Sequence, residues 1–424
     1  MSVSSQSALS AQGAIFPYFT QVDPELIRES AGRDPLGLLP VWSAIGRELV
    51  PNLASPVLQA NGIRAVLLIH WLAGRPRLQK LLTKPGRQRG FVRLMEGIIE
   101  YWLKRSGRPI CYGSQALVSG GDAFAVDARS GKTVVNGLHQ YYRGSCERAG
   151  LFNEDWHVDE ALGVLFQRSW SDAATSALTS ALEPYLERGK LLVREVADQP
   201  QIDAGLEAVF RDQSIQQHLR CILGEDKYRA VAQAFAELRR PGLALHQRAK
   251  LLASQALSAQ IDDMHRCEPF LLVLQDTFDL LRASANERVG AVADRIMPCL
   301  PQMRQRAAAF TGLAGKITKP GPARRMRDLQ QLATLLALPR HANERSTLVE
   351  FIEALVRYHC DCMEDRGRDP VLALDSELFT VHGDEEHYPE NKLARLAASE
   401  PAWDNDYYLT AASTIYRQLH GEPV

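Results

Sequence analysis

The sequence contains few of the features that reveal a protein's function directly. Only seven of its 424 residues are cysteine, and these are scattered without paired spacing. An odd, scattered set does not form the disulfide framework of a small secreted domain. The N-terminal stretch lacks a basic start and a continuous apolar run, so it does not resemble a secretory signal. These absences predict a protein of the reducing cytoplasm.

Long apolar runs and a strong net charge are also missing. The most apolar run, residues 65–72, is far too short to cross a bilayer, so no membrane partner is expected. The formal net charge is −1, which by itself does not point to nucleic acid. Aromatic residues make up only 7% of the chain, whereas helix-favouring Ala, Leu, Arg, Gln and Glu dominate. The composition therefore predicts a soluble, helical protein with two or three folded units.

No complete catalytic or nucleotide-binding motif is present in the sequence. Residues 130–133, Ser-Gly-Lys-Thr, match the end of a phosphate-binding loop, but Val126 stands where the first glycine of that loop is required. A valine there leaves no glycine loop to curl round a phosphate. The nucleophile elbow Gly-x-Ser-x-Gly is absent as well, although a catalytic triad can be assembled from residues far apart in sequence. We predict no catalytic residue and no cofactor.

The best metal candidate is a short run that contains His359, Cys360 and Cys362. Zinc ligands usually occur in pairs that are spaced to converge on one ion. Two cysteines at positions i and i+2 of a helix point about 200° apart, so they face different sides. Two acidic pairs, at 225–226 and 262–263, are typical of solvated helix surfaces. No metal site is therefore predicted.

A stretch rich in glycine and serine, which begins at Cys111, differs from the helical sequence on either side. Within it, two β-prone runs at 124–126 and 133–135 flank a turn that contains glycine, aspartate and serine. These runs predict a β-hairpin. A helix is expected to follow from 137 to 150, with Asn136 as its N-terminal cap.

Elsewhere, apolar residues recur mostly at helical spacing. The predicted fold is mainly α and multi-helical, with one small β-hairpin inserted in the N-terminal domain. Residues 191–196 are the one other candidate strand, and glycines and prolines at 315–322 indicate a linker. The expected domains are a flexible leader at 1–33, an N-terminal helical domain with the hairpin at 34–165, a helical middle domain at 166–314, and a C-terminal helical domain with an acidic segment at 323–424.

Charge is distributed unevenly along the chain. Between Arg75 and Arg108 there are ten Lys or Arg residues against two Glu, and from Arg75 to Arg93 there is no acidic residue. Between Asp361 and Asp406 there are thirteen Asp or Glu residues against four Lys or Arg. A basic run attracts phosphates because binding releases counterions from the nucleic acid. An acidic segment shields such a surface or docks on a basic partner, and the alternative is that both segments are ordinary solvated faces.

The candidates for contact with double-stranded DNA are therefore basic residues of the run at 75–108. Two more candidates come from the hairpin and the helix that follows it. Arginine and helix N-termini are common phosphate donors. We expect these residues to form one positive surface. The candidates are Arg75, Arg77, Lys80, Lys84, Arg87, Arg89, Arg93, Lys132 and Arg143.

Two segments, residues 36–72 and 136–151, resemble the N-terminal helical regions of uncharacterised accessory proteins from bacterial anti-phage defence islands. In those proteins a short proline turn precedes an apolar helix, and a Gly-Leu-x-x-Tyr-Tyr helix comes later. This chain has the second pattern as Gly-Leu-His-Gln-Tyr-Tyr, and the similarity covers about a third of the chain. The resemblance carries no catalytic motif. It implies a protein that works beside an ATPase, helicase or nuclease subunit and is not itself the enzyme.

Taken with the charge pattern, the resemblance leads to a functional hypothesis. The protein is expected to be a non-catalytic DNA-binding or scaffolding subunit of a multi-component bacterial system for antiviral defence. The alternative is a metal-dependent nuclease, or another hydrolase, whose site is assembled from distant residues. A cluster of buried carboxylates in the folded protein would favour that alternative.

Overall fold

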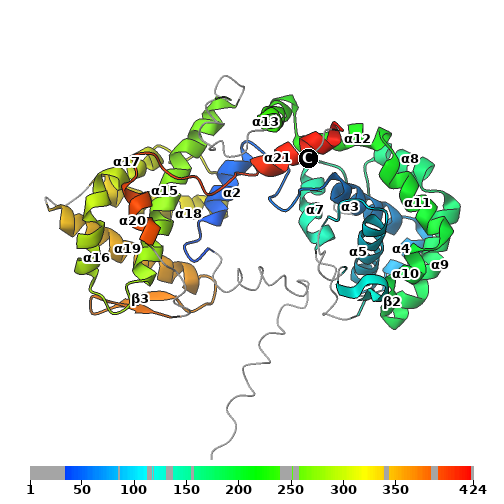
Figure 1. The fold of residues 1–424 in the computed structure, drawn as a ribbon, viewed down its shortest axis with the longest axis horizontal. Helices are drawn as coiled ribbons and strands as arrows, with labels where there is room; N and C mark the ends of the chain where they lie inside the picture. Colours follow the sequence, from blue (N-terminus) through cyan, green and yellow to red (C-terminus); the bar gives the residue numbers. More distant parts are fainter. Residues whose placement is uncertain are drawn as a thin grey trace, which may run out of the picture. The chain divides into compact units, whose positions relative to one another are not determined.

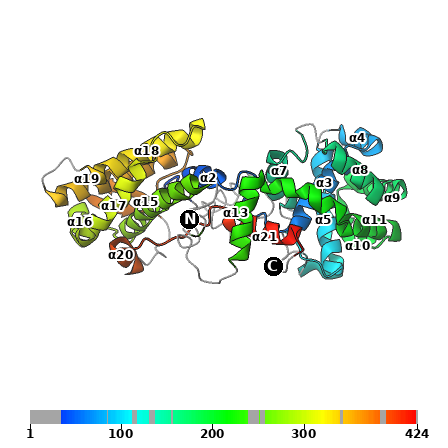
Figure 2. The ribbon, with the colours of Figure 1, turned by 90° about the horizontal axis from the view of Figure 1, so that it is seen from above.

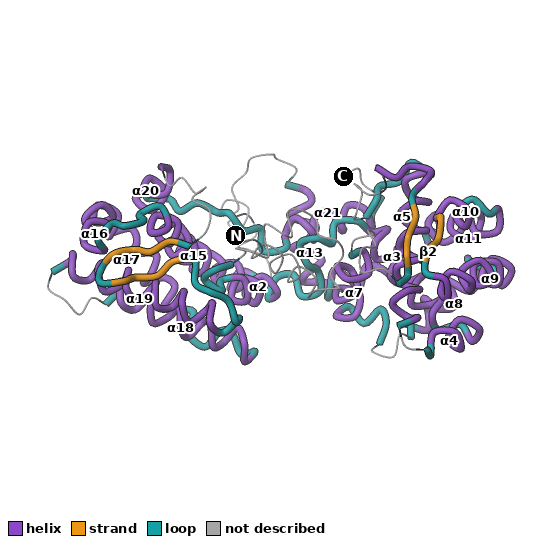
Figure 3. The backbone as a smooth tube through the Cα atoms, turned by 90° about the horizontal axis from the view of Figure 1, so that it is seen from below, coloured by secondary structure: helices purple, strands orange, loops and turns teal. Residues whose placement is uncertain are grey.

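A computed structural model describes residues 34–84, 86–111, 117, 119–129, 137–153, 157–238, 251, 257–338, 343–382 and 390–421. In this part of the chain the protein is mainly helical, with two small antiparallel strand pairs, which are orange in Figure 3. The predicted fold class is confirmed. None of the helices in the described residues is long and apolar enough to span a membrane.

The chain forms two compact units, and each combines segments that are far apart in sequence (Figure 1). Unit 1 contains residues 51–236 and 410–421, and unit 2 contains residues 34–50 and 237–409. The domains expected from the sequence follow one another along the chain, whereas these units interleave. Each unit therefore includes a helix from the opposite end of the described chain.

Hydrogen bonds show how the two ends of the chain are held. The side chain of Gln418 accepts from the backbone N–H of Ala60 at 2.6 Å and donates to the carbonyl of Leu58 at 2.8 Å. At the other end, the hydroxyl of Tyr358 donates to the carbonyl of Leu36 at 2.6 Å. These bonds join residues 322 to 360 positions apart, so no local sequence pattern reveals them.

Unit 1 consists of helices, two short 3₁₀ turns and one strand pair. In chain order its elements are α3 (Ala60–Ala73), α4 (Pro76–Leu82), α5 (Arg87–Arg105), η2 (Gly121–Ala123), β1 (Ala125–Asp127), α7 (Leu138–Arg148), α8 (Glu160–Ser169), α9 (Asp172–Arg188), β2 (Lys190–Leu192), α10 (Val193–Ala197), α11 (Pro200–Arg211), α12 (Ser214–Leu219), η3 (Arg220–Leu223), α13 (Asp226–Glu237) and α21 (Leu409–Leu419).

Helix α3 is the centre of unit 1. Thirteen of its 14 residues are buried, and it packs against α4, α5, α7, α8 and α11. The apolar run at 65–72 in the sequence therefore lies within a buried helix. Gly62 permits the closest contact, because a Cβ atom there would lie 2.3 Å from the ring of Tyr142 on α7. Buried Arg64 donates to the carbonyls of Val209 and Phe210, and so satisfies two acceptors at the end of α11.

The strand pair of unit 1 includes the first half of the predicted hairpin. Strand β1 lies where the sequence predicts a strand, and it pairs with β2, antiparallel, with Val126 opposite Leu191. Strand β2 overlaps the other candidate strand, 191–196, although most of that run forms α10. The second half of the hairpin, 133–135, lies outside the described residues, as do Asn136 and Lys132. The helix predicted at 137–150 is present as α7.

Unit 2 consists of helices and one strand hairpin. Its elements are α2 (Leu39–Arg47), α15 (Ser258–Arg282), α16 (Val289–Ile296), η4 (Met297–Cys299), α17 (Leu300–Thr311), α18 (Pro320–Ala337), α19 (Glu344–Glu364), β3 (Leu372–Asp375), β4 (Leu378–Val381) and α20 (Glu390–Ala397). The longest helix, α15, packs against α2, α17, α19 and α20 (Figure 2).

Two local features of unit 2 differ from the sequence analysis. The prolines that were expected to form a linker instead lie in the first turn of α18, which begins at Pro320. Proline is tolerated there because the N–H group that it lacks has no acceptor within the first turn of a helix. The β3–β4 hairpin was not predicted. Its turn residues, Ser376 and Glu377, both have positive φ, which is usually met by asparagine or glycine. The missing glycine concealed the turn.

A buried carboxylate of α15 holds the segment that precedes α21. Glu268 is 0% exposed and accepts hydrogen bonds from the backbone N–H groups of Asp404 and Asn405 and from the hydroxyl of Tyr407. Burial raises the pKa of Glu268, and these donors oppose that rise. The negatively charged segment 361–406 is thus attached in part through its backbone donors and not through its carboxylates.

We predict that Glu268→Ala lowers the free energy of unfolding of unit 2 by about 3 kcal/mol, because it leaves two backbone donors without their acceptor. Asp262→Ala, which removes an exposed carboxylate from the same helix, is the control and should change stability by less than about 0.5 kcal/mol. Urea unfolding followed by circular dichroism measures both. Equal stability of the two variants would show that Glu268 does not hold the segment.

Candidate functional site

The basic run at 75–108 is called the basic segment below. Its first arginines are paired with carboxylates of a single helix, α9. Arg75 lies 3.4 Å from Asp172, and Arg87 lies 2.7 Å from Glu187. Between them, Arg77 is 3.9 Å from Glu183 of the same helix. The acids that the segment lacks in its own sequence are therefore supplied by residues about 100 positions further along the chain.

The same arrangement continues at the end of α5. Arg105 is paired with both Asp198 and Asp203, and Arg108 lies 2.9 Å from Glu207 of α11. Exposed ion pairs of this kind contribute roughly 0–1 kcal/mol each. Their main effect here is electrostatic, because each carboxylate reduces the positive potential available to a phosphate backbone.

The remaining candidates for DNA contact are distributed over several elements. Lys80 and Lys84 are exposed and make no ion pair with any residue in the described part of the chain. Arg89 is exposed on the first turn of α5, whereas Arg93 is half-buried one turn later. Arg143 lies on α7, 3.9 Å from Glu147, as the i, i+4 spacing predicts. The expectation that all nine residues form one positive surface remains a prediction.

Unit 1 also contains a buried acid–base cluster between α3, α5 and α7, which was not predicted. The Nε2 atoms of His70 and His139 are 2.9 Å apart, so one ring must donate and the other accept. The backbone N–H of His139 donates to Glu96 Oε1 at 2.6 Å. Phe152 stacks on His70 with its ring centroid 3.9 Å away. A second buried carboxylate, Glu100, lies one helical turn further along α5. It accepts from the backbone N–H of Cys111 at 3.1 Å.

Burial shifts the pKa values of this cluster towards the neutral forms. The pKa of His70 falls to about 3 and that of His139 to about 4, because burial disfavours the charged ring and nearby Arg143 repels it. Burial raises the pKa of Glu96 to about 8, although Arg93 and the hydrogen bond from His139 oppose the rise. All three groups are therefore neutral at pH 7.

These acids were missed because α5 is buried on more sides than its sequence suggests. Glu96 and Glu100 are the two acids of the basic segment and are spaced i, i+4, which resembles a solvated helix face. Both are nevertheless at most 4% exposed. Their isolation among apolar neighbours in a strongly basic run is the one signal that could have revealed them.

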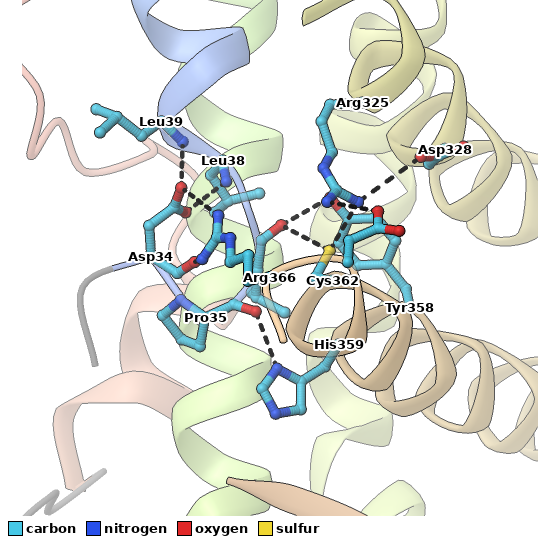
Figure 4. A network of polar contacts seen from close by, with 12 residues as sticks. Asp34, Pro35, Leu38, Leu39, Arg325, Asp328, Tyr358, His359, Cys362 and Arg366 are labelled. Carbon is cyan, nitrogen blue, oxygen red and sulfur yellow. Dashed lines mark hydrogen bonds and ion pairs between the residues drawn. The ribbon is translucent and has the colours of Figure 1, made fainter. Parts of the chain in front are cut away.

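Unit 2 contains a second polar network, in which α19 holds the segment before α2 (Figure 4). His359 Nε2 accepts from the backbone N–H of Val371, so its Nδ1 carries the proton and donates to the carbonyl of Pro35 at 2.9 Å. Arg366 donates to the carbonyl of Asp34 at 2.6 Å. Asp34 in turn accepts from the N–H of Leu38 at the start of α2.

This network explains the short run of histidine and cysteine that resembled a metal site. The thiol of Cys360 lies 3.6 Å from the carbonyl of Leu372, whereas that of Cys362 lies 3.7 Å from the carbonyl of Leu36. The two sulfurs therefore have separate partners, as their spacing on a helix predicts. Among the described residues, no three His, Cys, Asp or Glu side chains are placed to hold a metal ion.

A groove of about 610 Å³ lies between α18 and α19. The two helices run antiparallel, because Arg325 near the start of α18 contacts Asp365 just after the end of α19. Arg324 and Arg357 also line the groove, together with Tyr358 and the apolar side chain of Leu335.

Comparisons with known proteins do not assign a function. No family model, no curated protein and no solved structure matches the chain.

We predict that Glu96 lowers stability progressively as pH rises from about 4.5 to about 8. The folded protein retains a proton on Glu96 up to about pH 8, whereas the unfolded chain loses it near pH 4.5. The contribution of Glu96 to the free energy of unfolding should therefore fall by about 1 kcal/mol between pH 6.5 and 7.5. Glu96→Gln should remove this dependence, and the exposed Glu160→Gln should retain it.

Below pH 6.5 the two histidines act in the opposite direction. The unfolded chain takes up a proton on each ring, whereas His70 and His139 stay neutral in the folded protein until pH falls to about 4 and below. Stability should therefore also fall towards acid pH, with a maximum near pH 6.5. Urea unfolding between pH 5 and 8 measures the curve. An identical slope for the native protein and Glu96→Gln would contradict the assignment.

Proposed function

We propose that the protein is a non-catalytic scaffold subunit of a multi-component bacterial anti-phage system, and that proteins are its principal ligands. The observation that carries the proposal is the charge balance of unit 1. Five arginines of the basic segment, including Arg77 and Arg87, face carboxylates of α9 to α11. Such a surface attracts a polyanion weakly.

The internal polar groups support a non-catalytic role. Several buried acids and bases, such as Glu268 and His359, are hydrogen-bonded to backbone groups of their own unit. An active site instead presents such groups to a cleft where a substrate can reach them. Unit 2 also has an open groove between α18 and α19, and grooves between helices commonly bind segments of other proteins.

Partner binding is tested by purifying the tagged protein from its native cells after mild cross-linking. We expect a small set of proteins in fixed proportion to the tagged chain, and we expect that set to survive nuclease treatment. Loss of every partner on nuclease treatment would show that nucleic acid, and not protein contact, holds the assembly together. Recovery of the chain alone would exclude the scaffold role.

Direct DNA binding is the second candidate, because Lys80 and Lys84 are exposed beside the start of α5. With two phosphate contacts, raising the salt from 50 to 200 mM should weaken duplex binding by about tenfold. Lys80→Ala with Lys84→Ala should remove this dependence, whereas alanine at Lys190 and Lys227, two exposed lysines elsewhere in unit 1, should not. Fluorescence anisotropy measures both pairs. A dependence several times steeper would make DNA the principal ligand.

A further inference from the structure

Helix α20 is held on unit 2 mainly by charged side chains. It packs against α15 and α17 (Figure 1). Lys392 Nζ lies 3.0 Å from Asp276 and 2.7 Å from Asp279, two carboxylates of α15. Arg395 Nε lies 2.9 Å from the second oxygen of Asp276. Because Lys392 and Arg395 are spaced i, i+3, both side chains leave the same face of α20.

The C-terminal end of α20 is held by a third cation, Arg306 of α17. This arginine is 7% exposed and donates to the carbonyls of Arg395 at 3.2 Å and Ala398 at 2.5 Å. The last turn of a helix leaves such carbonyls without N–H partners and carries a partial negative charge. Arg306 therefore fixes the direction in which a helix lies on this face of unit 2.

Little apolar surface of α20 is buried. Leu396 is 0% exposed, whereas Leu393 is half-buried and Asn391, Ala394 and Ala397 are exposed. A helix of eight residues is too short to persist in water on its own, so α20 depends on the face that binds it. Segments with few buried apolar contacts are those that open while the rest of a domain stays folded.

The face under α20 is negatively charged once the helix is removed. Within the described residues, the ion pairs of Asp276 and Asp279 are made with Lys392 and Arg395. Departure of α20 therefore leaves two carboxylates beside the single cation of Arg306. Asp404, which pairs with Arg395 at 2.6 Å, lies in the chain that follows α20 and is not part of this face.

We propose that α20 is an autoinhibitory helix, which occupies a site on α15 and α17 for a basic amphipathic helix of a partner protein. The inference rests on the proposed scaffold function. The partner helix carries cations at i and i+3 and a leucine at i+4, so it repeats the contacts of Lys392, Arg395 and Leu396. Because α20 is tethered, it competes at a high effective concentration, and the partner binds only by displacing it. Asp276 and Asp279 repel an acidic helix or a nucleic acid.

The test opens the site by reversing the charge of α20. In Lys392→Glu with Arg395→Glu, the carboxylates of α15 repel the internal helix. The probe is a fluorescein-labelled peptide with the sequence of residues 390–400. In fluorescence anisotropy it should bind this double variant at least about tenfold more tightly than the native chain. Lys319→Glu with Arg327→Glu is the matched control, because it makes the same charge change at exposed positions on and next to α18. It should bind the peptide no more tightly than the native chain.

Two further peptides separate recognition by the site from general attraction. One has glutamate in place of both cations. The other exchanges each cation with the residue before it, which moves both cations to the face that Asn391 and Ala394 expose and keeps the composition. Both should bind the double variant at least about tenfold more weakly than the first peptide. Equal binding of the rearranged peptide, equal binding of the first peptide to native chain and double variant, or no binding to the double variant would overturn the proposal.

A measurement on the native chain keeps the test valid if circular dichroism shows that the double variant has lost helical content. A saturating concentration of the unlabelled peptide should speed the hydrogen exchange of residues 390–397, measured by mass spectrometry, because the displaced α20 loses its helical hydrogen bonds. The rearranged peptide should leave this exchange rate unchanged. Unchanged exchange with the first peptide would show that α20 is not displaced, and the proposal would fail.

The outcome is distinguishable from a failure of the scaffold function. If the peptide does not bind, but the same partners co-purify in the same proportion with the native chain and with Lys392→Glu, Arg395→Glu, the α20 site is wrong and the scaffold function stands. If no partner co-purifies with the native chain, the scaffold function fails, and the peptides still decide whether the site binds a basic helix. A partner that the double variant enriches and the peptide displaces supports both.

Discussion

Two long helices that are enclosed by their neighbours, α3 and α15, carry polar side chains into the core, and each must find its hydrogen bonds there. An unmet polar group in the core costs about 1–3 kcal/mol. His70 meets this requirement with His139, and Glu268 meets it with backbone donors of residues 404 and 405. The bonds to Glu268 also fix the path of the chain, because they hold the backbone of residues 404 and 405 at the carboxylate. Enclosure of polar groups therefore determines which distant segments come together.

Charge is balanced by the same long-range packing. The basic segment has no acid between Arg75 and Arg93, yet helix α9 brings Asp172, Glu183 and Glu187 to it. These pairs are exposed and individually weak, so they serve to neutralise the surface more than to stabilise it. The sequence of this segment suggests phosphate binding, but in the folded unit its positive charge is largely neutralised by the acids of α9. This is the reason for preferring a protein ligand to a nucleic acid.

The groove of unit 2 and the network beside it share residues. Arg325 and Tyr358 line the groove, and the same two side chains connect α18 and α19 to the segment before α2. A ligand in the groove would therefore contact a wall that also anchors the start of unit 2. Rigid walls favour shape-specific recognition, since little side-chain freedom remains to be lost on binding.

The sequence alone determined the helical class, the buried character of α3, the position of β1 and α7, and the opposed directions of Cys360 and Cys362. These depend on periodicity and composition, which act over a few residues. It could not determine the interleaved units, the β1–β2 pairing, the burial of Glu96 or the partners of the arginines. Each of these depends on segments between about 40 and 360 positions apart, whose meeting is decided by the packing of the whole unit. The residues of a helix predict whether one of its faces is polar or apolar. Which segment covers that face is decided only by the packing of the folded chain.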